Sequence, residues 1–321
     1  MTAAEAESLL DLATEVAVAA GRLLIGSGGR PEVVATKSSP TDVVTEADQA
    51  AEALIRDLIT EKRPGDRILG EEGGETGPQG VAGGERGEGG ERREGGERGA
   101  GGQGSGAGTG GQGGTGGQGG RSDVRWIVDP LDGTVNYLYG LPDWAVSIAA
   151  EVDGTVVAGA VFVPRRDELY SARLGHGAWL SSGALDWRGE DTGSPVRLAC
   201  NRDVPLAQAL VATGFGYAAG RRQIQGEVLR AVLPRVRDIR RGGSAAVDLC
   251  SVASGTVDAY YERGVNLWDI AAGGLIAAEA GAPVTGLHGR PPSPSMTLAA
   301  APPLLGELHD LLASTDPERD A

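Results

Sequence analysis

Residues 126–136 read Trp-Ile-Val-Asp-Pro-Leu-Asp-Gly-Thr-Val-Asn, and the rest of the chain is best interpreted from this stretch outward. Three apolar residues, typical of a buried strand, lead into two carboxylates, Asp129 and Asp132. Pro130 fixes one backbone dihedral angle between them, and Gly133 permits an abrupt turn after them. Carboxylate oxygens at the end of a strand suit hard cations such as Mg2+. The stretch therefore predicts a candidate divalent-cation site.

The backbone just after Asp132 offers a second kind of site. If a helix begins there, the N–H groups of Gly133 and Thr134 have no partner inside the helix and can donate to a phosphate oxygen. Mg2+ usually retains waters that a phosphate-bearing substrate can replace, so the two features suit one another. Taken alone, an Asp-x-x-Asp pair has a simpler explanation as an acidic turn after a strand.

Three other segments carry acidic residues at the ends of predicted elements. The run Ile68-Leu69-Gly70-Glu71-Glu72 repeats the design of an apolar strand followed by carboxylates. Asp269 opens a predicted helix of small residues, and Asp48 begins another helical pattern. An aspartate at a helix N-terminus is also explained more simply as a helix cap. The case for a cation site therefore depends on all four acidic segments together rather than on any single aspartate.

Taken in this order, the segments resemble the inositol monophosphatase family of Mg2+-dependent, lithium-sensitive phosphatases. The resemblance covers essentially the whole chain except one insert. It rests on five motifs, namely Gly70-Glu71-Glu72, Asp129-Pro130-Leu131-Asp132-Gly133-Thr134, Gly243-Ser244-Ala245-Ala246, Tyr261-Glu262-Arg263-Gly264 and Trp268-Asp269 with its Ala-Ala-Gly tail. One such motif is weak, whereas five in the right order are specific. The resemblance implies the layered α-β-α-β-α sandwich of this family and of fructose-1,6-bisphosphatase, with an α+β half followed by an α/β half.

The resemblance also implies a metal centre that holds two or three Mg2+ ions. Its carboxylate ligands would be Glu71, Asp129, Asp132 and Asp269, and Leu131 would add its backbone carbonyl. Electrostatics points the same way, because so many carboxylates in one cleft would repel one another strongly without cations.

The implied reaction is metal-assisted hydrolysis of a phosphate monoester. Glu71 would hold the ion that lowers the pKa of a bound water, and Thr134, hydrogen-bonded to Asp48, would orient that water for attack on phosphorus. The remaining carboxylates would hold the ion that neutralises the leaving alkoxide. The amides of Gly133 and Thr134 would hold the phosphate.

The implied substrate is a small phosphorylated polyol, and inositol monophosphate is the single best choice. Substrate contacts would come from Gly133, Thr134, Gly243, Ser244, Ala245, Glu262 and Asp269. Glu262 would contact a substrate hydroxyl, or else it is a solvated glutamate at a strand end. Position 266 is Asn where animal members of the family carry His, so fine specificity does not carry over from the resemblance. Histidinol phosphate, fructose 1,6-bisphosphate and phosphoadenosine phosphate are the alternatives, because the same scaffold also serves them. Lys37 is expected near the attacking water or the phosphate, or else on the surface.

Other classes of protein have less support. His176, His288 and His309 lie away from every carboxylate motif, so a His-Ser triad, a zinc site or a phosphohistidine mechanism lacks its residues. A protein that acts mainly through protein contacts, with the insert as a tether, is the alternative from a different class. The presence of every ligand-type residue argues against it.

Residues 73–121 are the insert that the resemblance does not cover. About half of them are glycine, and Val81 is the only branched aliphatic residue among them. Such a segment buries too little apolar surface to offset its ordering entropy, so we expect it to be disordered. A formal Gly-x-Gly-x-x-Gly at Gly106, Gly108 and Gly111 is rejected as a nucleotide site, because no strand precedes it and no helix follows.

The predicted organisation follows from this insert. Residues 1–72 and 122–185 would form the N-terminal half with the metal site, and residues 186–321 the C-terminal half that completes the substrate pocket. The net charge of −15 argues against nucleic acid or an anionic membrane as the main partner. Cys200 and Cys250 are isolated, which is typical of a reducing compartment. We therefore expect a cytoplasmic protein, and the resemblance implies a homodimer.

Periodicity predicts the individual elements. Helices are expected at 5–25, 46–61, 223–233, 244–253 and 269–280. Strands are expected at 67–69, 125–128, 144–152, 155–163, 168–172, 196–199, 209–213, 237–240 and 257–261. Asp153-Gly154 is the clearest hairpin turn.

Overall fold

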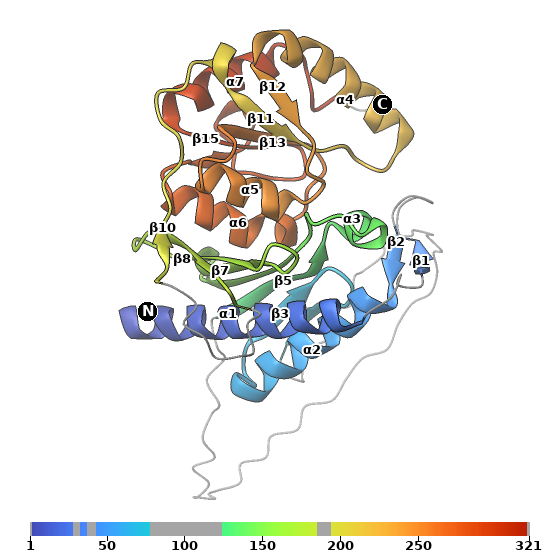
Figure 1. Ribbon diagram of the computed structural model, residues 1–321, viewed down its shortest axis with the longest axis vertical. Helices are drawn as coiled ribbons and strands as arrows, with labels where there is room; N and C mark the ends of the chain where they lie inside the picture. Colours follow the sequence, from blue (N-terminus) through green and yellow to red (C-terminus); the bar gives the residue numbers. More distant parts are fainter. Residues whose placement is uncertain (1, 28–32, 37–42, 78–123, 185–193, 320–321) are drawn as a thin grey trace, which may run out of the picture.

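The computed structural model describes the chain except residues 1, 28–32, 37–42, 78–123, 185–193 and 320–321. Its described part forms five layers, which Figure 1 shows stacked from bottom to top. Helices α1 (Ala3–Gly26) and α2 (Glu46–Lys62) form the first layer. A large sheet, the helix pair α5 (Ala245–Ala253) and α6 (Leu267–Glu279), a small sheet and an outer helical layer follow. The predicted α-β-α-β-α sandwich is confirmed.

The large sheet has eight strands in the order β10-β9-β8-β7-β6-β5-β3-β4. Their bounds are β3 Arg67–Gly70, β4 Gly74–Thr76, β5 Val124–Asp132, β6 Ala145–Val152, β7 Thr155–Val163, β8 Glu168–Arg173, β9 Ala178–Ser182 and β10 Val196–Arg197. All neighbours are antiparallel except β3 and β5, which run parallel. Because parallel neighbours end at the same edge of a sheet, the acidic ends of β3 and β5 lie side by side.

The small sheet has five strands in the order β12-β11-β13-β15-β14. Their bounds are β11 Leu210–Thr213, β12 Asp238–Arg240, β13 Ala259–Glu262, β14 Val284–Thr285 and β15 Thr297–Ala300. Helices α4 (Ala219–Val232) and α7 (Pro302–Ala313) cover its outer face. A separate hairpin of β1 (Val33–Thr36) and β2 (Val43–Thr45) leads into α2, and the short helix α3 (Thr134–Tyr139) follows β5.

Four apolar clusters fill the four spaces between these layers. Trp126 and Phe162 lie between the first helices and the large sheet, and Ile127 lies on the opposite face of that sheet against α5 and α6. Tyr260 packs between the small sheet and the same helix pair, and Leu308 packs under the outer helices. Alternating side chains of one strand thus enter two different cores, which fixes the register of the strand.

Most predicted elements are confirmed to within a few residues, with three differences. β5 runs to Asp132 rather than stopping at residue 128, through a register irregularity between Asp129 and Asp132. Helix α6 begins at Leu267 rather than at Asp269. Strands β1, β2, β4, β9, β14 and β15 were not predicted. Strand β4 occupies Gly74–Thr76, at the start of the segment assigned to the insert, and most of that segment lies outside the described residues.

The contact between α5 and α6 provides a test of the layering, because two adjacent glycines of α6 differ in their surroundings. A Cβ atom at Gly273 would lie 3.0 Å from the Leu249 Cβ and 3.3 Å from the Ala246 carbonyl oxygen of α5, whereas one at Gly274 meets nothing within 4 Å. Gly274→Ala should stabilise the fold by up to about 1 kcal/mol through helix propensity. Gly273→Ala should destabilise it by about 1–3 kcal/mol through overpacking.

Thermal unfolding of both variants and the parent measures this difference. A shift of about 2–4 °C in Tm corresponds to 1 kcal/mol at this chain length. Equal shifts for the two substitutions would contradict the close packing of α5 against α6.

Candidate metal and phosphate site

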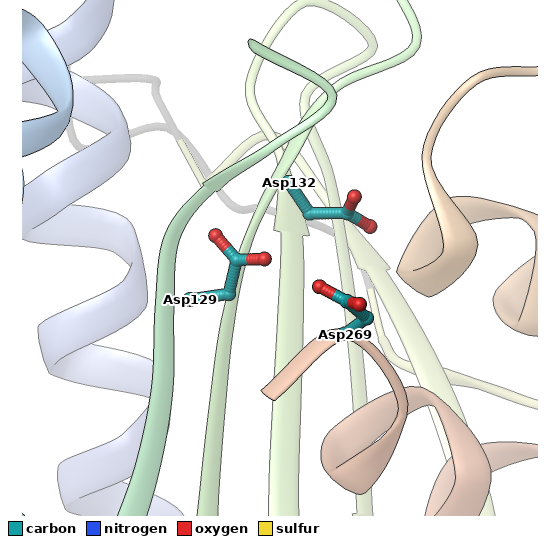
Figure 2. Close-up of side chains that lie close together, drawn as sticks. All are labelled: Asp129, Asp132 and Asp269. Atoms are coloured by element: carbon teal, nitrogen blue, oxygen red, sulfur yellow. The ribbon is translucent and has the colours of Figure 1, made fainter. Parts of the chain in front are cut away.

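Three aspartates gather where the large sheet meets the middle helices. Asp129 and Asp132 come from the end of β5, and Asp269 comes from the first turn of α6. One carboxylate oxygen from each lies within 4.8 Å of the others, and Figure 2 shows the three side chains pointing toward one another. Oxygens at such mutual distances can share one cation.

The backbone of β5 explains why two aspartates three positions apart face one site. Asp129 pairs with Ser147 of β6, and Asp132 pairs with Ala145, so the strand is locally irregular between them. A bulge of this kind redirects side chains that a regular strand would send to opposite faces. The Leu131 amide donates to the Asp129 carboxylate at 2.9 Å, which tightens the same turn.

Asp269 is held by its own helix. Asn266 is the residue that caps α6, and its backbone N–H donates to the Asp269 Oδ2 at 2.5 Å. The Asp269 carboxylate therefore helps to cap α6, as the helix-cap explanation from the sequence proposed. The same carboxylate also belongs to the cluster.

Asp132 is held from the opposite side by the N-terminus of α5. The Ser244 hydroxyl and the Ala246 amide donate to its Oδ2 at 2.6 and 2.7 Å. Ser244, predicted as a substrate contact, is buried and does not line the cavity described below.

Burial and mutual repulsion dominate the electrostatics of the cluster. Burial, then the charges of Glu71, Asp132 and Asp269, raise the pKa of Asp129 well above its usual value. Burial and the neighbouring Asp132 and Glu71 do the same to the pKa of Asp269. Burial raises the pKa of Asp132 to about 6 against the opposing hydrogen bonds from α5. A divalent cation would remove this penalty, so the donor set fits a hard metal ion.

Thr134 connects the cluster to helix α2. Its hydroxyl lies 3.1 Å from the Asp48 Oδ1 and 3.1 Å from the Leu131 carbonyl oxygen. Asp48 in turn accepts the Thr45 backbone N–H at 2.8 Å and the Thr45 hydroxyl, so it is fixed at the start of α2. The predicted hydrogen bond between Thr134 and Asp48 is present.

A cavity of about 470 Å3 opens in front of the cluster. It is lined by Glu71, Asp129, Leu131, Asp132, Gly133, Thr134, Gly243, Ala245, Glu262, Asn266 and Asp269, among others. Glu71 is thus in the cavity wall, although it is not one of the three residues within 4.8 Å of one another. Burial raises the pKa of Glu262 to about 7, against a hydrogen bond from the Tyr260 hydroxyl at 3.0 Å.

Sequence reasoning missed the basic and aromatic part of this cavity. Phe215 and Tyr217 line it from the loop before α4, Arg221 lines it from the first turn of α4, and Arg241 lines it directly after β12. The loop before α4 could have been recognised from the sequence Gly214-Phe215-Gly216 directly after a strand. A Gly-rich turn at the carboxyl end of a strand commonly borders a ligand. Lys37 lies outside the described residues.

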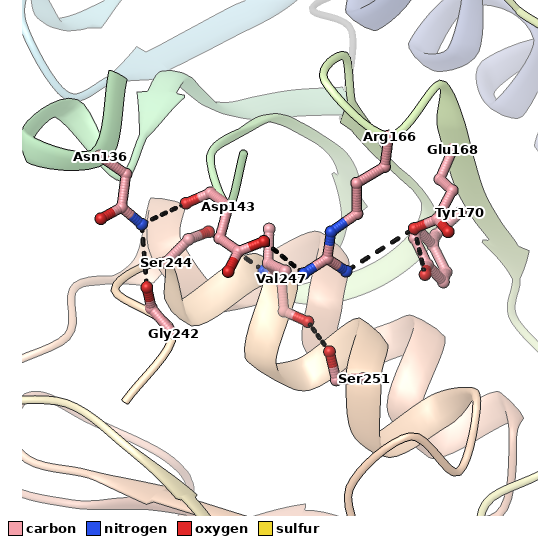
Figure 3. A network of polar contacts seen from close by, with 9 residues as sticks. All are labelled: Asn136, Asp143, Arg166, Glu168, Tyr170, Gly242, Ser244, Val247 and Ser251. Carbon is pink, nitrogen blue, oxygen red and sulfur yellow. Dashed lines mark hydrogen bonds and ion pairs between the residues drawn. The ribbon is translucent and has the colours of Figure 1, made fainter. Parts of the chain in front are cut away.

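A polar network around Asn136 ties the two halves of the chain together beside the cavity (Figure 3). The Asn136 amide donates to the Asp143 carbonyl oxygen at 2.5 Å and to the Gly242 carbonyl oxygen at 2.9 Å. Arg166 forms an ion pair with the Asp143 carboxylate. The segment after β12, which leads to the N-terminus of α5, is therefore fixed relative to β5.

Comparisons with known proteins agree with the geometry. Residues 5–319 match the inositol monophosphatase family. The chain is 43% identical over 288 residues to the inositol-1-monophosphatase SuhB of Mycobacterium tuberculosis, which covers 90% of this chain and 83% of that protein. It is 33% identical to the Nus factor SuhB of Pasteurella multocida over 88% of this chain and 86% of that protein.

The solved structure of Mycobacterium tuberculosis SuhB superposes with a TM-score of 0.70 at 38% identity, covering 98% of each chain. A family match over nearly the whole chain, together with the shared sandwich, defines the class as phosphoric monoester hydrolases. The chain belongs to the inositol monophosphatase family. Among the described residues, no helix combines the length and the apolar character needed to cross a membrane.

The raised pKa of Asp129 predicts how the metal-free protein responds to pH. A carboxyl group whose pKa is higher in the folded state favours folding below its unfolded pKa, and that contribution is lost as pH rises through the folded pKa. In the presence of a chelator, Asp129→Asn should therefore have a higher Tm than the parent at pH 8, and the difference should shrink toward pH 5.

Thermal unfolding in chelator at both pH values tests this expectation. Asp66→Asn is the matched control, because Asp66 is also buried but is paired with Arg63 and accepts the Trp126 indole N–H at 2.8 Å. Removing that charge should lower the Tm at pH 8. An Asp129→Asn protein less stable than the parent at pH 8 without metal would refute mutual repulsion in the cluster.

Proposed function

We propose that this protein is a Mg2+-dependent phosphatase that hydrolyses inositol monophosphate to inositol and phosphate. The observation that carries the proposal is the cluster of Asp129, Asp132 and Asp269 at the floor of a 470 Å3 cavity. Acidic residues alone would repel a phosphate monoester, whereas a cluster loaded with cations attracts it. Membership of the family supports inositol monophosphate as the substrate.

The metal ligands in this proposal are Glu71, Asp129, Asp132, Asp269 and the Leu131 carbonyl, for two or three ions. When bound, Mg2+ supplies an activated water and charge stabilisation for the phosphoryl group and the leaving oxygen. Leu131 is included because it lines the cavity between Asp129 and Asp132, where its carbonyl oxygen lies 3.1 Å from the Thr134 hydroxyl.

Protein groups orient the reaction at this site. Because Asp48 accepts the Thr134 hydroxyl hydrogen, a lone pair of the Thr134 oxygen remains available to accept a hydrogen bond from the attacking water. Asp48 thereby fixes the Thr134 oxygen, which would orient the water for attack on phosphorus in line with the leaving oxygen. Gly133 and Thr134 line the cavity beside the cluster, where their amides would contact the phosphate.

The polyol would occupy the part of the cavity formed by the C-terminal half. Glu262 lines it beside Gly243 and Ala245 and would accept a hydrogen bond from a substrate hydroxyl. Burial raises its pKa, and the larger neutral fraction that results would reduce its repulsion of an anionic substrate.

Arg221 and Arg241 bear on the alternative substrates. Both line the cavity, so a second phosphate, as in fructose 1,6-bisphosphate or phosphoadenosine phosphate, would find a cationic partner there. Histidinol phosphate would instead bring a positively charged amine next to these two arginines. A substrate panel should therefore contain inositol 1-phosphate, both bisphosphates and histidinol phosphate, compared by kcat/KM.

The decisive activity test measures phosphate release from inositol 1-phosphate by the purified full chain. Release should require Mg2+, and Asp129→Asn should reduce kcat at least about 100-fold, because an amide keeps the side-chain shape but loses the ligand charge. Circular dichroism should show an unchanged fold. Near-normal turnover by the variant would refute the metal assignment.

Lithium should inhibit the same reaction at limiting Mg2+, as is general for the family. The physical basis is a site that holds several small cations weakly enough to exchange them. Titration of LiCl with a KCl control at equal ionic strength separates occupation of the site from screening. Phosphate release that is insensitive to millimolar Li+ would place the protein outside the lithium-sensitive branch while leaving metal-dependent hydrolysis intact.

A cytoplasmic location and a homodimer also belong to this proposal. They are supported by the isolated cysteines and by family membership. The alternative from a different class is that this protein acts mainly through contacts with other proteins. One relative is named Nus factor SuhB, which supports that alternative. Absence of phosphatase activity toward the whole panel in Mg2+ would favour that alternative.

A further inference from the structure

One partly buried ion pair outside the cavity, between Glu52 and Arg56, holds the turn that carries Glu71. Glu52 of α2 is 3% exposed, and its two carboxylate oxygens accept the backbone N–H groups of Glu72 and Gly73, each at 2.8 Å. Arg56, one helical turn later, donates its Nε to the same carboxylate at 2.8 Å. A charge-assisted pair with several directed hydrogen bonds of this kind specifies geometry.

Arg56 extends the contact to strand β4. Its guanidinium donates to the Gly74 carbonyl oxygen at 2.7 Å and to the Thr76 hydroxyl at 2.7 Å. The pair therefore binds both the turn after β3 and the strand that follows it. Residues 78–123 are outside the described part of the chain, which resumes with β5.

The glycines of this turn are explained by the same pair. A Cβ atom at Gly70 or at Gly73 would lie 2.6 Å from the Glu52 Oε1, so the Glu52 carboxylate would have to move away from the amides that it binds. Glycine at both ends of the Gly-Glu-Glu-Gly sequence thus leaves room for the Glu52 carboxylate to approach the backbone on both sides of Glu71.

Glu71 is consequently fixed from two directions. On its N-terminal side, Gly70 pairs with Val128 of the parallel strand β5, next to Asp129. On its C-terminal side, the Glu72 and Gly73 amides are bound to Glu52. These contacts set the backbone position from which the Glu71 carboxylate reaches the cavity.

We propose that Glu52 and Arg56 are positioning residues for Glu71, which hold its carboxylate at the distance from Asp129 that cation binding requires. The pair also makes the position of Glu71 independent of the long segment that begins after β4, because Arg56 holds β4 as well. This inference rests on the proposed metal role of Glu71. Neither Glu52 nor Arg56 lines the cavity, so neither touches the reacting atoms.

The test compares Mn2+ binding to the metal-stripped full chain, followed by electron paramagnetic resonance, in the parent and in Glu52→Gln. The substitution keeps the shape but loses the ion pair and one acceptor. Loss of a group that orients a metal ligand typically weakens affinity by 10–100-fold. We expect Mn2+ affinity to fall about tenfold or more, and the Mg2+ concentration for half-maximal activity to rise while kcat recovers at high Mg2+.

Glu279→Gln is the matched control for stability. Glu279, at the far end of α6, likewise accepts two backbone N–H groups, those of Gly175 and Gly177, each at 2.7 Å. Its substitution should lower the Tm without changing Mn2+ affinity. Gly73→Ala is the second variant, since it would displace the carboxylate of Glu52 without changing any charge, and it should also weaken Mn2+ binding.

Each outcome decides the inference. Weaker Mn2+ binding in Glu52→Gln and Gly73→Ala, but not in Glu279→Gln, supports it. Unchanged Mn2+ affinity with a lower Tm would assign the pair a purely structural role and overturn it. A parent protein that binds no Mn2+ would overturn the proposed metal site together with this inference, and the parent titration alone identifies that case.

Discussion

The structure depends on a group of carboxylates that are forced together where two halves of the chain meet. Asp129 and Asp132 belong to the large sheet, and Asp269 belongs to the helix pair that separates the two sheets. Removing three such groups from water without a compensating charge costs free energy, and the raised pKa values are the expression of that cost. The protein therefore carries local destabilisation at the position where a cation would bind.

The remaining architecture holds these groups in place despite their repulsion. Asp132 is bound by two donors from the start of α5, and Asp269 by the first turn of α6. The apolar contact between these two helices, which needs a glycine at position 273, fixes both donor sets relative to the sheet. Strain of this kind at a functional site is sustained by stability elsewhere, here by four apolar clusters on both faces of the two sheets.

Much of the site could be predicted from sequence because its chemistry is local. Asp129, Leu131, Asp132, Gly133 and Thr134 lie within one turn, so a strand ending in carboxylates and glycine already indicated them. The contacts that position these residues could not be predicted. Glu52 accepts amides 20 and 21 positions away, and Ser244 donates to an aspartate 112 positions away. Such pairs depend on how the layers stack. Glu52 has no local pattern that distinguishes it from an ordinary helix residue, and the motif that contains Ser244 predicted a substrate contact rather than a hydrogen bond to Asp132.

The same reasoning explains the errors in element boundaries. Periodicity ended β5 at residue 128, because Pro130 and the two aspartates read as a turn, whereas pairing with β6 continues to Asp132 through an irregular register. Strand β15 (Thr297–Ala300) is short and wholly buried, and a run of Thr-Leu-Ala-Ala has no alternation to reveal it.

The central claim is that the three clustered aspartates form a cation site, and a crystal structure grown with MnCl2 tests it most directly. Anomalous scattering at the manganese edge locates the ions independently of activity. The account predicts a peak coordinated by oxygens of Asp129, Asp132 and Asp269, with a further peak bound by Glu71, and loss of the first peak in Asp129→Asn. Crystals that hold Mn2+ only at other surface carboxylates, with none at this cluster, would contradict it.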